Sequence, residues 1–194
     1  GTPLKYLLSL AGLGALTIPF LVFFVLKDYQ RMRILVFLDP MRDPLGAGYN
    51  VIQSRIAVGS GGFAGKGFLL GTQSKLKFLP EPHTDFIFSV FSEEFGFAGN
   101  IILIILFTIL LFRIILTGIN SRDRRCKILV SGVASWIWFQ MFESIGMSIG
   151  LTPVTGLPLP FLSYGGSSLL ATFIALGLIA SIYIEEVNKP RVLL

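Results

Sequence analysis

The chain has 194 residues, of which 53% are hydrophobic and only 14% charged, and its mean hydropathy is +0.77. Soluble domains carry roughly 25% charged residues and interrupt their apolar segments, so this composition excludes a soluble globular protein and a disordered one. From Ser144 to Ile184 the sequence contains no Asp, Glu, Lys, Arg or His. We therefore expect an integral membrane protein. Its single cysteine, Cys126, excludes an intrachain disulfide and the cysteine clusters of zinc or iron–sulfur sites.

Four apolar segments are long enough to cross a bilayer, which takes about 20 residues of helix. They predict an all-α fold in which residues 1–194 form one polytopic membrane domain. The expected spans cover residues 6–26, 85–116, 128–150 and 167–185.

The positions of Lys and Arg predict the orientation of these spans. The short connection at residues 117–127 holds four basic residues, which is typical of the cytoplasmic side. The long loop at residues 27–84 then faces outward, although it holds eight basic and four acidic residues, because long loops translocate largely regardless of charge. Such a basic loop needs an anionic partner, either lipid head groups or a phosphate-bearing substrate.

Within the outward loop the composition changes to Gly, Ser, Lys and Pro between Asn50 and Pro82, which predicts irregular backbone rather than helix or strand. Its centre, residues 59–67, contains five glycines. Glycines at positive φ let backbone N–H groups approach an anion, but a flexible linker is an equally weighted interpretation.

A new helix is expected to follow this loop. His83 or Thr84 can cap it and place Asp85 in its first turn. An acidic residue at this position often only complements the helix dipole. Helical spacing, however, brings further polar residues close to the face of Asp85, and ionisable groups near an apolar span usually face a bundle interior or a water-filled cavity. We expect the wall of a polar cleft that opens outward, formed by Asp85, Ser89, Ser92, Glu93 and Gly96.

Polar residues also interrupt the last two spans. Gln140 and Glu143 lie one helical turn apart in the third span, and Glu143 is either a functional group or a protonated partner in an interhelical hydrogen bond. Residues 151–166 contain prolines and glycines that prevent a continuous helix. Irregular backbone at membrane depth is tolerated only where protein or a cavity covers it, so we expect an outward, re-entrant loop that lines the same cleft.

Several motifs, in this order along the chain, resemble the SEDS family (shape, elongation, division and sporulation). They are residues 53–62 (QSRIAVGSGG), 71–74 (GTQS), 78–81 (FLPE), 83–88 (HTDFIF), 93–94 (EE), 156–161 (GLPLPF) and 163–168 (SYGGSS). The pieces GKG at residues 65–67 and GTQ at residues 71–73 are more similar to the rod-shape members than to the division members. Glu143 and Ser144 depart from the family pattern, in which an apolar residue and Asn are usual.

The resemblance covers nearly the whole chain, but family members have further helices on the N-terminal side. We therefore expect this chain, which opens with Gly1, to be the C-terminal half of such a protein. Half a bundle cannot close a cleft, so the 194-residue chain by itself is expected to be inactive.

The resemblance implies a peptidoglycan glycosyltransferase that polymerises lipid II into a growing glycan strand, at the outer face of the bacterial cytoplasmic membrane. It also implies a class B penicillin-binding protein as partner, contact with bacterial membrane lipids, and no nucleic acid. Two alternatives stay open: a transporter that flips the lipid-linked precursor, with Glu143 in its pathway, and a non-catalytic scaffold for a penicillin-binding protein.

The chemistry of glycan polymerisation sets the residues to look for. A GlcNAc 4-hydroxyl attacks the anomeric carbon of a MurNAc that carries undecaprenyl diphosphate, so a base must accept a proton and cations must balance the leaving group. By the resemblance, Asp85 is the expected base; it can equally orient the hydroxyl or hold a divalent cation. His83 either positions Asp85 or is a local hydrogen-bonding residue. The expected substrate-binding residues are Arg55, Lys66, His83, Ser89, Glu93, Ser163 and Tyr164.

Overall fold

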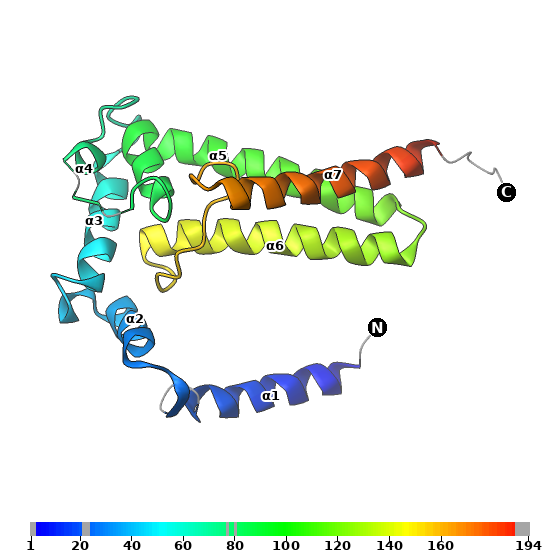
Figure 1. The fold of residues 1–194 in the computed structure, drawn as a ribbon, viewed down its shortest axis with the longest axis horizontal. Coiled ribbons are helices and arrows are strands. Elements are labelled where there is room, and N and C mark those ends of the chain that lie inside the picture. The colour runs from blue at the N-terminus through cyan, green and yellow to red at the C-terminus, as the bar shows by residue number, and fades with distance from the viewer. Residues whose placement is uncertain (1–2, 21–23, 77, 80, 189–194) are drawn as a thin grey trace.

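The computed structural model describes residues 3–20, 24–76, 78–79 and 81–188. Every regular element in that part of the chain is helical, which confirms the all-α class (Figure 1). In chain order the elements are α1 (Leu4–Phe20), α2 (Asp28–Leu38), η2 (Pro40–Arg42), α3 (Ala47–Ser60), α4 (Thr72–Lys75), α5 (Ile87–Asn120), α6 (Arg124–Ile149) and α7 (Gly166–Asn188).

Helices α5, α6 and α7 run side by side as an elongated bundle (Figure 1). Each is long and apolar enough to cross a membrane. Their shared core consists of Leu111, Ile114, Val130, Ala134, Ile137, Ile179 and Ile182. Another side of α5 exposes a row of large apolar residues, including Ile102, Ile105 and Ile109, as a lipid-facing surface does. Three of the four expected spans thus coincide with such helices.

Helix α1 lies apart from this bundle and is connected to it through α2 and α3 (Figure 1). It has 17 residues, and residues 21–23, in the second half of the expected first span, lie outside the described part of the chain.

The loop at residues 27–84 is more helical than its composition predicts. Helix α3 continues to Ser60, so the expectation of irregular backbone from Asn50 onward is wrong for its first eleven residues. Val51, Ser54 and Ala57, spaced three residues apart, are buried where α3 packs against α5 and α6. Tertiary packing of this stripe stabilises a helix whose end, rather than whose interior, contains the glycines.

Helix α5 is broken at Gly96, which has φ 66° and ψ −164°. The glycine-rich residues 61–67 enter the break. On its C-terminal side, the amides of Phe97 and Ala98 donate to the carbonyls of Gly62 and Phe63 at 2.9 and 3.0 Å. The glycine segment thus supplies acceptors that the interrupted helix lacks.

The N-terminal side of the break is bonded to the same segment. The amides of Lys66 and Gly67 donate to the carbonyls of Glu93 and Glu94 at 2.9 and 3.0 Å. Gly65 has φ 78°, and a Cβ atom there would overlap the carbonyl of Glu94. The segment is therefore a fitted part of the fold and not a flexible linker.

Two boundaries differ from the expected ones. Helix α5 begins at Ile87 with Phe86 at its N-cap, so Asp85 lies in the turn before the helix and not in its first turn. The connection expected at residues 117–127 shortens to 121–123, because α5 extends to Asn120 and Asp123 caps α6 by accepting from the Arg125 amide at 2.9 Å.

Candidate functional site

Asp85 is half-buried. No described residue donates a hydrogen bond to its carboxylate or forms an ion pair with it. It lies against Gly156, in the irregular segment that connects α6 to α7. A Cβ atom on Gly156 would stand 3.1 Å from Asp85 Oδ2, and Gly156 has φ 77°. Only glycine meets both conditions without strain. The α6–α7 segment therefore passes directly over a carboxylate that remains available to a ligand.

The far end of this segment is tied to the residues that precede Asp85. Ser163 Oγ donates to the Thr84 carbonyl at 2.8 Å and accepts from the Leu159 amide at 2.7 Å. The Tyr164 amide donates to the His83 carbonyl at 2.8 Å. These bonds use the Ser163 hydroxyl and the Tyr164 backbone, whereas the side chains of His83 and Tyr164 are exposed beside them.

The near end of the segment is tied to α6 by Glu143. Thr155 Oγ1 donates to Glu143 Oε1 at 3.1 Å, directly before Gly156. Glu143 is buried, and so are Gln140 Oε1 and Ser144 Oγ, neither of which has a partner among the described residues. The Glu143 carboxylate therefore accepts a hydrogen bond from the loop that passes over Asp85.

Glu93 has the opposite environment to Asp85. Its side chain is 0% exposed, and its carboxylate accepts hydrogen bonds from Lys66 Nζ at 2.7 Å, from the amide and hydroxyl of Thr72 at 2.8 and 2.9 Å, and from the Gln73 amide at 3.1 Å. Such a set of donors holds the glycine segment and α4 against α5.

The helical spacing predicts that the polar residues of α5 form the wall of an open cleft, and this prediction is wrong for Ser89, Ser92 and Glu93, which are buried. Ser89 is also 0% exposed; its hydroxyl lies 2.7 Å from that of Ser54, which in turn donates to the Ser148 carbonyl. These polar residues join α3, α5 and α6, because buried hydroxyls need partners.

The two expected phosphate-binding cations also have protein acceptors. Lys66 Nζ is paired with Glu93 and donates to Thr72 Oγ1 at 2.9 Å. The Arg55 guanidinium is exposed and donates to the Gly150 carbonyl at 3.2 Å. Neither is bonded to Asp85, so the three side chains do not form one hydrogen-bonded group.

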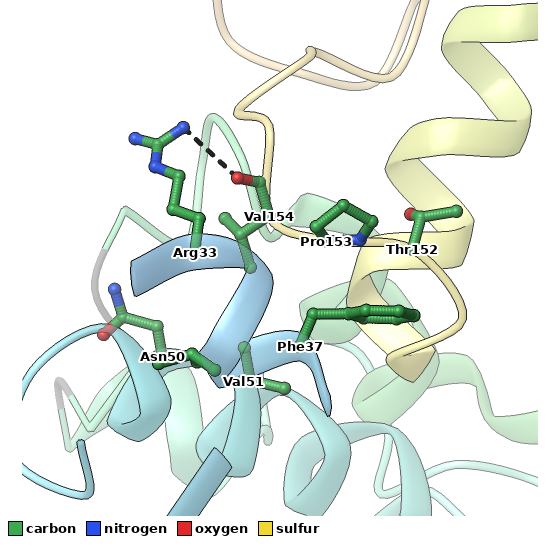
Figure 2. Close-up of a pocket in the computed structure, with 8 residues that line it drawn as sticks. Arg33, Phe37, Asn50, Val51, Thr152, Pro153 and Val154 are labelled. Carbon is green, nitrogen blue, oxygen red and sulfur yellow. Dashed lines mark hydrogen bonds between the residues drawn. The ribbon is translucent and has the colours of Figure 1, made fainter. Parts of the chain in front are cut away.

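A cation that the sequence did not single out lies closer to the loop over Asp85. Figure 2 shows Arg33 of α2 directed at the Val154 carbonyl, to which Nη1 donates at 3.2 Å. Arg33 lines a pocket of about 90 Å³ together with Asn50 of α3 and Thr152. Val154 precedes Gly156 by two residues. The sequence carries no local signal for this role of Arg33, because the carbonyl that it contacts is 121 residues away.

A divalent cation needs several oxygen ligands. No three His, Cys, Asp or Glu side chains gather as a metal site in the described ranges.

A model of a cell cycle protein family, FTSW_RODA_SPOVE, matches residues 1–188. Peptidoglycan glycosyltransferase MrdB of Escherichia coli K12 is 47% identical over 171 residues, and peptidoglycan glycosyltransferase RodA of Treponema pallidum is 48% identical over 158. The matches cover 88% and 81% of this chain but 46% and 36% of those relatives. The chain also resembles a chain of a solved peptidoglycan synthase complex, with a TM-score of 0.75 and 40% identity over 97% of this chain and 52% of that one.

Proposed function

This chain belongs to the FTSW_RODA_SPOVE family of cell cycle proteins, and from that premise we propose that it is part of a peptidoglycan glycosyltransferase that polymerises lipid II for cell elongation and rod shape. The relatives with that activity in their names are about twice as long as this chain or longer. The activity is therefore proposed for the complete protein.

The observation that carries the proposal is the Asp85 carboxylate beneath Gly156, which has no hydrogen-bond or ion-pair partner among the described residues. In the proposed reaction, the 4-hydroxyl oxygen of GlcNAc bonds to the anomeric carbon of the lipid-linked MurNAc. Asp85 accepts the proton of that hydroxyl at the same time. The bond from that carbon to the diphosphate breaks, and undecaprenyl diphosphate leaves. A positioned base of this kind contributes about 10²- to 10⁴-fold to a rate.

For the leaving diphosphate we propose Arg33 and Arg55. Each guanidinium is exposed and donates a hydrogen bond to a carbonyl of residues 150–154, and a guanidinium has five N–H donors, so each can also donate to a diphosphate bound beside this loop. Lys66 is a weaker candidate than the sequence suggested, because its ammonium group already neutralises Glu93.

The proposed topology has four spans in this part of the protein, with α1 as the first. By the positive-inside rule, Arg122 and the basic first turn of α6 lie on the cytoplasmic side, and Asp85, at the opposite end of α5, lies on the outer side. Residues 151–165 would then be re-entrant. A class B penicillin-binding protein is the proposed partner, in keeping with the matched chain of a peptidoglycan synthase complex.

The test replaces Asp85 in the full-length protein, purified with its penicillin-binding partner and supplied with lipid II. Asp85→Asn keeps the side-chain volume and should lower polymerisation at least about 10²-fold without changing thermal stability. Asp28→Asn, in the first turn of α2, is the matched control and should leave the rate unchanged. Normal polymerisation by Asp85→Asn would refute the proposal.

The same preparations separate the two alternative functions. Translocation of lipid II across vesicles, without polymer and independent of Asp85, would indicate a flippase. Full polymerisation by the complex after Asp85 is replaced would indicate a scaffold for a partner that holds the activity.

The role of Arg33 predicts a weaker affinity for the donor. Arg33→Gln should raise the KM for lipid II about tenfold, because one charge-assisted contact to a diphosphate is lost. Arg42→Gln, which removes an exposed charge from the same outward loop, is the control. Equal effects of the two substitutions on KM would remove Arg33 from the site.

A further inference from the structure

A second and larger pocket lies between α5 and α7, at the end of the bundle far from Asp85. Its volume is about 840 Å³, roughly that of 28 water molecules in the liquid, so it is much larger than a single phosphate ion needs. It lies where α5 ends and the α5–α6 connection begins, which the proposed topology assigns to the cytoplasmic half of the membrane.

Apolar side chains form the long walls of this pocket. Leu110 and Ile114 come from α5, and Leu176, Ile179 and Ala180 come from α7. Ile109 and Phe112, on the same part of α5 but outside the lining, are exposed apolar residues. Such walls favour an acyl chain over a polar solute.

The lining of this pocket also includes basic residues. Arg113 and Arg122 line it, and no described residue accepts a hydrogen bond from either guanidinium group. Arg113 lies about two turns before the end of α5, from where an arginine side chain can extend to the head-group level. Tyr183 of α7 lines the same region with an exposed side chain.

One acidic group also lines the pocket, and it is engaged with the turn. Glu186 accepts from Ser121 Oγ and from the Arg122 amide, both at 3.1 Å. Two arginines against one glutamate leave the lining positive, and Arg124 and Arg125 on the first turn of α6 add to the potential nearby.

We propose that this pocket binds an anionic phospholipid, with its phosphate at Arg113 and Arg122 and one acyl chain along the apolar walls between α5 and α7. Guanidinium groups are suited to phosphate, and basic pockets between membrane helices on the cytoplasmic side hold acidic head groups. Free phosphate would leave the apolar walls unfilled, and a zwitterionic lipid would bring no net charge for the arginines. The site is distinct from the Asp85 site.

The test uses the full-length protein in nanodiscs of phosphatidylcholine with increasing phosphatidylglycerol, and counts retained lipid by native mass spectrometry. The Arg113→Gln/Arg122→Gln double variant should bind phosphatidylglycerol about 25-fold more weakly, since each direct guanidinium–phosphate contact contributes about fivefold. Arg124→Gln/Arg125→Gln removes the same charge beside the pocket but no contact with the phosphate, and should weaken binding less than about threefold, because salt screens charges that do not touch the ligand.

A second variant tests the acyl-chain wall with both arginines intact. Ala180→Phe fills the pocket and should reduce retained phosphatidylglycerol, whereas Ala171→Phe, at an exposed position of α7 outside the pocket, should not. Melting of each variant in phosphatidylcholine alone checks that it is folded. The proposal would be overturned by equal losses of binding in the two arginine pairs, by no preference for phosphatidylglycerol, or by unchanged binding in Ala180→Phe. Any of these results is expected if another part of the protein fills the pocket.

Discussion

Two carboxylates eight residues apart, one in the turn before α5 and one in the second turn of that helix, have opposite environments. Glu93 is 0% exposed and saturated with donors from Lys66, Thr72 and Gln73. Asp85 is half-buried and has no partner among the described residues. A buried carboxylate that lost its donors would be costly, whereas a half-exposed one can exchange water for a substrate hydroxyl. The comparison separates a carboxylate that holds the fold together from the one that we propose for the reaction.

The largest expected effect comes from removing the Glu93 carboxylate, which accepts several hydrogen bonds. Glu93→Ala removes the acceptor of two backbone amides and of the Lys66 ammonium group, and should lower the free energy of unfolding by about 4 kcal/mol. Asp85→Ala should change it by less than about 0.5 kcal/mol, since no hydrogen bond is lost. Denaturant unfolding of the full-length protein in micelles measures both. Similar costs for the two substitutions would contradict the assignment.

A smaller effect is expected where the glycine segment enters α5. Gly65→Ala places a methyl group on the Glu94 carbonyl inside the break and should cost about 3 kcal/mol of unfolding free energy. Gly62→Ala has a similar positive φ, 56°, but open space around the new methyl group, and should cost about 1 kcal/mol for backbone strain alone. Equal costs in the same assay would mean that the close fit at Gly65 is unimportant.

The smallest expected effect concerns the position of Asp85, the proposed catalytic base. Gly156→Ala brings a methyl group to 3.1 Å from Asp85 Oδ2, so the carboxylate has to shift by a few tenths of an ångström. We expect polymerisation to fall about tenfold, since small displacements of a reacting group are costly. Gly62→Ala, with comparable backbone strain far from Asp85, should not slow the reaction, and a parallel loss of rate there would argue against a specific contact.

Much of this molecule could be predicted from its sequence. The apolar runs gave the three long helices of the bundle, and the motifs around Asp85 gave the family. The sequence also brought residues 83–85 and 163–164 together as candidates, and hydrogen bonds from Ser163 and Tyr164 to Thr84 and His83 now connect them.

The failures have a common physical reason. Composition describes a segment, but the role of a polar residue depends on partners far along the chain. From the sequence, Lys66 is expected to be a cation available to a phosphate. In the structure it is paired with Glu93, which lies 27 residues later in the chain. Arg33 had no local signal, because the carbonyl it binds belongs to Val154. The glycines of residues 61–67 suggested an anion site, whereas their amides and carbonyls complete a broken helix.

The break at Gly96 bears on how the protein is assembled. Amides and carbonyls left open in α5 would face a steep penalty in hydrocarbon, and here the glycine segment satisfies them. That segment is synthesised first, and α5 emerges from the ribosome after it. The turns of α5 on both sides of Gly96 therefore gain these hydrogen-bond partners only when the preceding glycine segment has docked against them.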